Sequence, residues 1–298
     1  MDFKELQNYP QPIYVIGHKN PDIDSIVSSK ILSDILNANG IISNYAVIEG
    51  EYPDEYNMRM IKECMNYQPV VIKKKDIANH YYFLVDHNDI SQSVGRSDLV
   101  IGCIDHHPDS GNITQLILTD HCCAALFLFS LFKNKYDFTK EQKYQIYMAF
   151  LNDSIFTKSS RYSKKDEELV SQLGFSNNYE TMFKQFFIPT DLTENHRQVF
   201  LTNGHKNHTF PDYQFESSYI NSFNTLYMDE YREVVENYSG NFLGIWKDYT
   251  EGKTYIFFKY NNKFYEKMYD FIASRATTIL NDALEMLNSK AKSLLLEK

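Results

Sequence analysis

The chain has 298 residues, of which 43% are hydrophobic, so it is long enough for two domains of ordinary size, and wholesale disorder is excluded. Its net charge of −9 argues against a nonspecific nucleic-acid binder, because such proteins neutralise phosphates with lysine and arginine. No signal peptide precedes residue 20, and no apolar run is long enough to span a membrane. We therefore expect a soluble, cytoplasmic protein that contacts neither nucleic acid nor membrane.

Short apolar runs alternate with helical patterns in the first half of the chain. This alternation predicts a parallel β-sheet with helices on both faces. From residue 122 to residue 174 the pattern becomes helical throughout. Strands are expected at 13–17, 44–50, 82–86 and 100–105, and helices at 25–40, 53–65, 122–132, 140–153 and 164–174.

A mixed polar stretch with Pro189 indicates a domain boundary. We expect an N-terminal catalytic domain over 1–180, a linker over 181–195, and a smaller C-terminal α/β domain over 196–298. The last helical pattern has its apolar residues near one face, which fits core packing and, as the less favoured interpretation, a partner interface. In the second domain the expected strands lie within 214–223 and 240–260, and the expected helices within 230–239 and 279–298.

Acidic and imidazole side chains follow the apolar runs in four short blocks. Because the carboxyl ends of strands in an open α/β sheet are where ligands bind, we expect these side chains to converge there. An unpaired carboxylate in apolar surroundings is costly, so each acidic residue needs a partner or a metal ion. The six candidate metal ligands are His18, Asp22, Asp24, Asp86, His106 and Asp153.

Other interpretations of these residues stay open at this point. Asp22 also fits a loop, and Asp24 also fits the N-cap of the helix that follows. His87 and Asp89 fit groups that orient ligands, and Asp105 fits a residue that holds an imidazole tautomer.

The candidate ligand set combines two imidazole nitrogens with four carboxylates. Such mixed ligation suits Mn²⁺, Co²⁺, Fe²⁺ or Zn²⁺ better than an all-oxygen Mg²⁺ or Ca²⁺ site. Four carboxylates balance two divalent ions, and two ions ~3.5–4 Å apart lower the pKa of a shared water and stabilise an in-line attack. Phosphoryl transfer is the natural reaction for such a site, so the first hypothesis is a hydrolytic enzyme.

The blocks HKNPDIDS, DHND, DHH and NDSIFTKS, in this order, resemble the DHH phosphoesterase superfamily, and within it the manganese-dependent family II inorganic pyrophosphatases. The resemblance extends over most of residues 13–175. It implies a two-domain enzyme with its active site in the cleft, which hydrolyses pyrophosphate to two phosphates through a metal-bridging hydroxide. It also implies two Mn²⁺ or Co²⁺ ions, Mg²⁺ bound with the small phosphate substrate, and compatibility with a homodimer.

The same resemblance assigns roles to single residues. It makes the six candidate ligands metal ligands, gives Asp24 and His107 catalytic roles, and places His107 against the substrate. Arg275 and Lys206 are the expected substrate-binding cations. The family carries lysines where this chain has Ala276 and Thr277. Loss of one preorganised charge contact costs ~10²–10³ in rate, so the phosphate-binding side of the site is expected to be weaker.

Two alternatives remain open beside pyrophosphate hydrolysis. The neutral residues Ala276 and Thr277 favour a DHH phosphoesterase that acts on polyphosphate or a nucleotide. A non-catalytic metal-binding or regulatory protein is the other alternative, and the complete ligand set argues against it.

Overall fold

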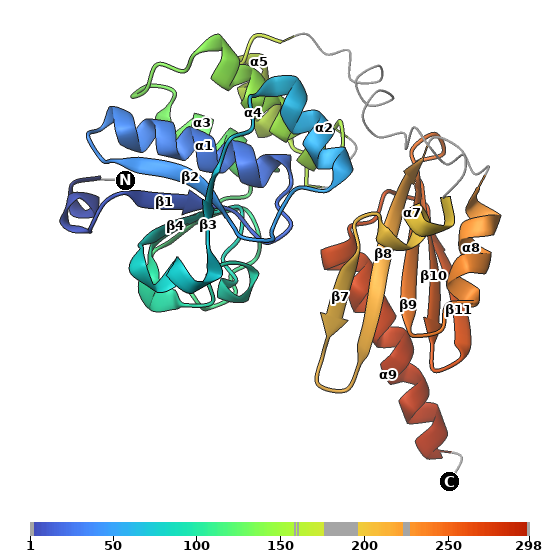
Figure 1. The fold of residues 1–298 in the computed structure, drawn as a ribbon. Coiled ribbons are helices and arrows are strands. Elements are labelled where there is room, and N and C mark those ends of the chain that lie inside the picture. The colour runs from blue at the N-terminus through green and yellow to red at the C-terminus, as the bar shows by residue number, and fades with distance from the viewer. Residues whose placement is uncertain (1–2, 158, 160, 176–195, 223–226, 297–298) are drawn as a thin grey trace. The chain divides into compact units, whose positions relative to one another are not determined.

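In a computed structural model the chain divides into two compact units, Met1–Met182 and Phe183–Lys298 (Figure 1). The structure describes residues 3–157, 159, 161–175, 196–222 and 227–296. The linker expected over 181–195 lies outside the described residues. Each unit has its own sheet and is described by itself.

The first unit contains a six-stranded parallel sheet in the order β3-β2-β1-β4-β5-β6. The chain runs outward from β1 to β3 on one side and from β4 to β6 on the other, so the strand order reverses between β1 and β4. Such a reversal point is where open α/β sheets bind ligands. The strands are β1 (Ile13–Ile16), β2 (Ser43–Ile48), β3 (Val70–Ile72), β4 (Tyr82–Val85), β5 (Val100–Asp105) and β6 (Leu116–Leu118).

Helix α1 (Ile23–Ala38) packs on β1, β2 and β4 and is itself in contact with α3 and α4. On the other face, a buried apolar cluster that includes Ile16 and Leu84 packs against residues of short 3-10 helices. The expected helices on both faces are therefore α-helices on one face and 3-10 helices on the other. The remaining α-helices in the described part of this unit are α2 (Glu55–Cys64), α3 (Ala124–Phe132), α4 (Lys140–Asp153) and α5 (Lys164–Ser171).

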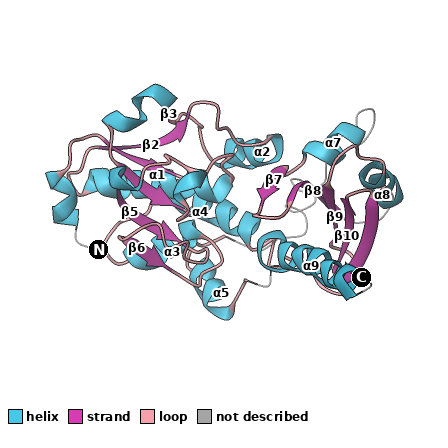
Figure 2. Ribbon diagram, turned by 90° about the horizontal axis from the view of Figure 1, so that it is seen from below, coloured by secondary structure: helices cyan, strands magenta, loops and turns pink. Residues whose placement is uncertain are grey.

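The second unit contains a five-stranded sheet in the order β11-β10-β9-β8-β7, in which β8 and β9 are parallel and the other neighbours are antiparallel. Helix α8 (Met228–Glu236) packs on β9 and β10, while a π-helical turn (Arg275–Ile279) and α9 (Leu280–Leu296) lie on the opposite face (Figures 1 and 2). The other elements are α7 (His196–Thr202), β7 (Lys206–Thr209), β8 (Gln214–Ser222), β9 (Phe242–Asp248), β10 (Lys253–Tyr260) and β11 (Lys263–Tyr269).

The two-domain α/β class expected from the sequence is confirmed. Among the described strands, those that the sequence did not single out are β3, β6, β7 and β11. All four are edge strands, and their residues are mostly exposed or half-buried. Edge strands need no long apolar run, so the pattern that marks a buried strand is missing there. Among the described residues, no helix is both long and apolar enough to cross a bilayer.

Candidate metal centre

The reversal of strand order between β1 and β4 brings the first candidate ligands together. His18 follows β1, Asp86 follows β4 directly, and His106 follows β5. Asp153 is the last residue of α4, as expected for a ligand at a helix end. Parallel strands therefore bring three candidate ligands to one sheet edge, and a helix brings another.

One group of candidate ligands consists of His18, Asp22 and Asp86, whose ligand atoms lie within 4.8 Å of one another. The His18 Nε2 lies 3.4 Å from Asp86 Oδ2 and 3.9 Å from Asp22 Oδ2. This group is half-buried on its His18 and Asp22 side, while Asp86 is buried.

A second group consists of Asp24, Asp86, His106 and Asp153, again within 4.8 Å. The His106 Nε2 lies 3.0 Å from Asp86 Oδ1, 3.4 Å from Asp153 Oδ2 and 3.9 Å from Asp24 Oδ2. Asp86 belongs to both groups and turns a different carboxylate oxygen to each. The six residues selected from the sequence therefore form two adjoining ligand groups that share one carboxylate.

The start of α1 places two of these carboxylates. Asp22 is the N-cap, since its Oδ1 accepts a hydrogen bond from the Ser25 backbone N–H at 3.0 Å. Asp24 lies in the first turn and accepts from the backbone N–H groups of Ala124 at 2.7 Å and Ala125 at 2.9 Å, at the N-terminus of α3. The interpretation of Asp24 as a helix N-cap is therefore wrong, because Asp22 caps the helix.

Asp86 adopts a left-handed backbone conformation with a φ of 61°. A non-glycine residue rarely adopts this conformation, and such residues cluster at functional sites. Its side chain is 1% exposed, and its Oδ2 has no hydrogen-bond donor among the described residues. A buried carboxylate oxygen without a donor is costly, and a cation would satisfy it.

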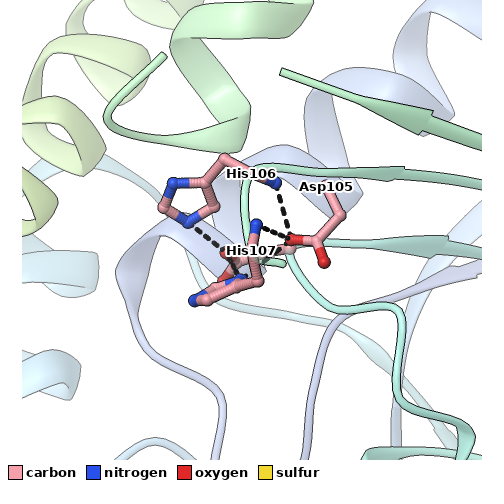
Figure 3. Close-up of side chains that lie close together, drawn as sticks. Asp105, His106 and His107 are labelled. Carbon is pink, nitrogen blue, oxygen red and sulfur yellow. Dashed lines mark hydrogen bonds and ion pairs between the residues drawn. The ribbon is translucent and has the colours of Figure 1, made fainter. Parts of the chain in front are cut away.

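The DHH block separates into an orienting carboxylate and two imidazoles (Figure 3). Asp105 Oδ1 accepts from the backbone N–H of His106 at 2.7 Å and is 2.9 Å from His107 Nδ1, and Asn88 Nδ2 donates to Asp105 Oδ2 at 2.5 Å. Although burial alone would raise the pKa of Asp105, the hydrogen bond with His107 holds it below its ordinary value. Asp105 thus orients the His107 ring, whose side chain is 38% exposed.

Two further residues of the DHND block, His87 and Asp89, differ in their surroundings. His87 is buried, its Nδ1 lies 2.9 Å from the Val85 carbonyl oxygen, and burial lowers its pKa to about 4. Asp89 accepts from the Ser91 backbone N–H at 2.9 Å and caps a 3-10 helix. Among the described residues, neither is part of a candidate ligand group.

The electrostatics of the two ligand groups favour bound cations. Burial and the neighbouring carboxylates raise the pKa of Asp24 and of Asp153 well above their ordinary values. Although burial alone would raise it, the pKa of Asp86 is held well below its ordinary value by the hydrogen bond with His106 and by the charge of His18. Four crowded carboxylates with two imidazoles, and a buried oxygen without a donor, match the donor set of first-row divalent metal ions. The residues present therefore fit such ions.

Arg161 is a neighbour of this centre that the sequence did not single out. Its Nη1 lies 3.4 Å from His106 Nδ1. Burial lowers the pKa of His106, and the charge of Arg161 lowers it further. In Asp153 the same charge only partly offsets the rise in pKa that burial and the neighbouring carboxylates cause. The side chain is exposed. It lies in a loop between α4 and α5, where no periodic pattern marks a residue for contact with the site.

The two expected substrate-binding cations both belong to the second unit. Arg275 begins the π-helical turn, donates from Nη1 to the Gly204 carbonyl oxygen at 2.5 Å, and lies with its Cζ 5.2 Å from the centre of the Tyr219 ring. Burial lowers the pKa of its guanidinium. Lys206 begins β7 and is exposed. The side chains of residues 276 and 277 lie outside the described part of the structure.

Comparisons with known proteins agree with the motifs. Residues 12–152 match the model of the DHH family, N-terminal domain. The manganese-dependent inorganic pyrophosphatase of Methanothrix thermoacetophila is 28% identical over 169 residues, which are 54% of this chain and 53% of that protein. A protein of Bacillus pumilus, provisionally named as the same enzyme, is 30% identical over 168 residues, 53% of each chain. The match thus spans about half the length of these relatives.

Two solved structures are similar to this chain in fold. A Methanococcus jannaschii protein, provisionally assigned as a family II inorganic pyrophosphatase, has a TM-score of 0.68 at 17% identity and covers 91% of this chain and 97% of its own. An exopolyphosphatase-related protein from Bacteroides fragilis has a TM-score of 0.53 at 15% identity and covers 97% of this chain and 96% of its own. At these identities the likeness concerns the fold. Residues 12–152 are therefore similar to the DHH family, N-terminal domain, and the expected resemblance to family II inorganic pyrophosphatases is confirmed.

Proposed function

We propose that this protein is a metal-dependent phosphohydrolase that hydrolyses inorganic pyrophosphate to two phosphates. The observation that carries the proposal is the position of Asp86, whose two oxygens face two separate ligand groups, with Oδ2 3.4 Å from His18 Nε2 and Oδ1 3.0 Å from His106 Nε2. A carboxylate that belongs to two adjoining ligand groups suits a pair of adjacent metal ions. The names of the relatives support manganese as the ion.

Each candidate residue has a role in this proposal. His18, Asp22 and Asp86 would hold one ion, and Asp24, Asp86, His106 and Asp153 the other. Two Mn²⁺ or Co²⁺ ions, with Mg²⁺ on the substrate, would polarise phosphate oxygens and lower the pKa of a bound water. As a ligand of the second ion, Asp24 would take a direct part in the reaction.

His107 is proposed to contact the substrate and to assist the leaving phosphate. Its Nδ1 is engaged with Asp105 at 2.9 Å, which leaves Nε2 for the substrate. Arg275 and Lys206 are proposed to neutralise phosphate charge. Several expectations stay predictions. They are the binding of substrate in a cleft, the domain limits near residues 180 and 196, the cytoplasmic location and the homodimer.

A second candidate substrate class has one observation in its favour. Ala276 and Thr277 stand where the resembling family carries lysines, so this chain differs at residues expected to bind pyrophosphate. An exopolyphosphatase-related protein has the same fold. Polyphosphate or a nucleotide is therefore the alternative substrate, and a non-catalytic metal-binding or regulatory protein is the second alternative.

The test is phosphate release by purified protein that has been treated with a chelator and then given Mn²⁺, Co²⁺ or Mg²⁺ separately. Pyrophosphate, tripolyphosphate, long-chain polyphosphate and a nucleoside triphosphate are compared at equal phosphate concentration. We expect Mn²⁺- or Co²⁺-dependent release from pyrophosphate, and none from Asp86→Asn. Faster release from another substrate would replace pyrophosphate by that substrate, and metal binding without release from any of them would support the non-catalytic alternative.

A further inference from the structure

One face of the C-terminal sheet gathers basic side chains from several elements. Side chains alternate across a strand, so the register places Lys206 of β7 on the face of Ser217, its partner in β8, and Lys247 of β9 on the face of Leu243 and Ile245. This is the face on which the π-helical turn packs, because Ile279 belongs to the same buried cluster as Leu243 and Ile245. Arg275, the first residue of that turn, therefore joins the same face.

Two of these cations share one aromatic ring. The Arg275 Cζ lies 5.2 Å and the Lys247 Nζ 5.6 Å from the centre of the Tyr219 ring. A cation within ~6 Å of a ring centre is attracted by the charge distribution of the ring. Lys247 is only 8% exposed, which is unusual for a lysine. Tyr219 thus holds Lys247 near the guanidinium that is the expected substrate contact.

The position of Tyr219 is itself restricted. A Cβ added at Gly204 would lie 2.0 Å from Tyr219 Cε1, so the ring packs directly on the backbone there. The Gly204 carbonyl oxygen in turn accepts from Arg275 Nη1 at 2.5 Å. The loop before β7, the ring and the guanidinium therefore form one packed unit in which the cations keep their positions.

The surroundings are electropositive. His208 of β7 lies with its Nε2 2.8 Å from Ser217 Oγ, and its pKa falls to about 4 because of burial and then the charges of Arg275, Lys206 and His205. Glu216 precedes Ser217 in β8, so by the same alternation it lies on the opposite face of the sheet, where its carboxylate is engaged by His205 at 2.8 Å and by the Tyr238 hydroxyl at 2.9 Å. Cations gathered on a partly buried face attract an anion that reaches them.

We propose that Lys247 is a phosphate-binding residue, which together with Arg275 and Lys206 forms a cationic site for pyrophosphate on the C-terminal unit. The inference rests on the proposed function for the identity of the anion. It gives the chain a positive charge from β9 in a region where residues 276 and 277 are neutral. The sequence did not predict Lys247 as a site residue, because a single lysine in an otherwise apolar strand gives no signal of a binding role.

The experiment measures pyrophosphate binding to the full chain in the presence of a chelator, by calorimetry, so that the cations alone are tested. Lys247→Gln should weaken binding about 10-fold, as expected for loss of one charge-assisted contact. The matched control is Lys259→Gln, a half-buried lysine of the same sheet whose Nζ donates to the Tyr238 carbonyl oxygen at 2.6 Å. It should bind like the wild type. Circular dichroism and thermal unfolding establish that each variant is folded.

A second variant, in which the lost positive charge is restored at a different residue, separates loss of charge from loss of structure. Adding Ala276→Lys to Lys247→Gln should recover most of the lost affinity, and Lys247→Arg should retain it. In turnover with Mn²⁺, the loss in Lys247→Gln should fall mainly on KM. Unchanged affinity and KM in folded Lys247→Gln, an equal loss in Lys259→Gln, or no binding of pyrophosphate by the wild type without metal would each overturn the assignment.

The outcome for Lys247 is separable from the outcome for the proposed function. Wild-type binding that depends on Lys247, without any phosphate release in Mn²⁺, would uphold the anion site and overturn the hydrolysis. Phosphate release by the wild type with no effect of Lys247→Gln on affinity or KM would uphold the hydrolysis and overturn the role of Lys247.

Discussion

Asp86 Oδ1 lies 3.0 Å from His106 Nε2, and the carboxylate that makes this contact is buried at the end of β4 in a left-handed backbone conformation. Its other oxygen faces His18. The residue therefore connects ligands from β1 and β5 across the point where strand order reverses. This connection can be tested by comparing a substitution of Asp86, which belongs to both ligand groups, with substitutions of residues that belong to only one group.

Asp86→Asn is expected to lose metal binding at both groups, whereas Asp22→Asn should weaken the first group and Asp153→Asn the second. Loss of a residue that only orients a metal ligand lowers metal affinity ~10–100-fold. Loss of a ligand shared by both groups should lower metal affinity by more than this. Asparagine also tolerates the left-handed conformation, so the backbone is preserved. Titration with Mn²⁺ followed by electron paramagnetic resonance gives the stoichiometry. Equal loss in all three variants would contradict two groups with one shared member.

Gly17→Ala is expected to displace His18. A Cβ at residue 17 would lie 1.9 Å from Ser25 Oγ, the atom that accepts from the His18 backbone N–H at 3.0 Å. Forcing these groups apart should cost about 1–3 kcal/mol of stability and weaken the first ligand group. Thermal unfolding and Mn²⁺ titration measure both effects. Gly40→Ala, at a residue with open space around it and a φ of 78°, is the control and should lose stability without losing metal.

Asp105→Asn is expected to release the His107 ring. Asp105 Oδ1 now lies 2.9 Å from His107 Nδ1, and an amide in its place no longer favours the tautomer with the proton on Nδ1. If pyrophosphate is the substrate, kcat should fall about 10–100-fold with Mn²⁺ stoichiometry unchanged. Comparison with His107→Gln separates the two residues. Full activity in Asp105→Asn would exclude an orienting role.

Asp166→Asn is expected to destabilise the first unit in a pH-dependent way. Asp166 has no exposed surface, lies 2.7 Å from His121 Nδ1, and accepts from Ser163 at the start of α5. Loss of these contacts should cost about 1–3 kcal/mol near neutral pH. Although burial alone would raise it, the pKa of Asp166 is lowered by the hydrogen bonds with His121 and Ser163.

Because the folded-state pKa is below the unfolded one, the stabilisation is present above the ordinary aspartate range near about 4 and disappears as the pH falls through the lowered pKa. The difference in unfolding free energy between wild type and Asp166→Asn should therefore be constant above about pH 5 and shrink below about pH 4. Urea unfolding across this range measures it. Asp98→Asn, in an exposed pair with Arg96, serves as the control and should show no measurable change. A difference that grows on acidification would contradict this assignment.

Much of the N-terminal fold was predictable from local sequence. The runs at 13–17 and 100–105 are nearly unbroken apolar stretches, which is typical of strands buried on both faces of a parallel sheet. The pattern at 140–153 predicted α4 to the residue, where Thr139 and Gln142 form a capping box. Edge strands such as β7 and β11 were not predicted, because half-exposed strands carry no apolar run.

The sequence by itself determined which side chains are available at the candidate metal centre. Asp and His at or shortly after the ends of apolar runs predicted the six residues, and those runs that are parallel strands end at a common edge. Only the tertiary structure decided that Asp86 is shared, that Asp22 and not Asp24 caps α1, and that Arg161 and Lys247 lie beside the expected site residues. Apart from the helix cap, these relationships join residues distant in sequence, and their distances depend on strand order and helix packing, which local patterns do not encode.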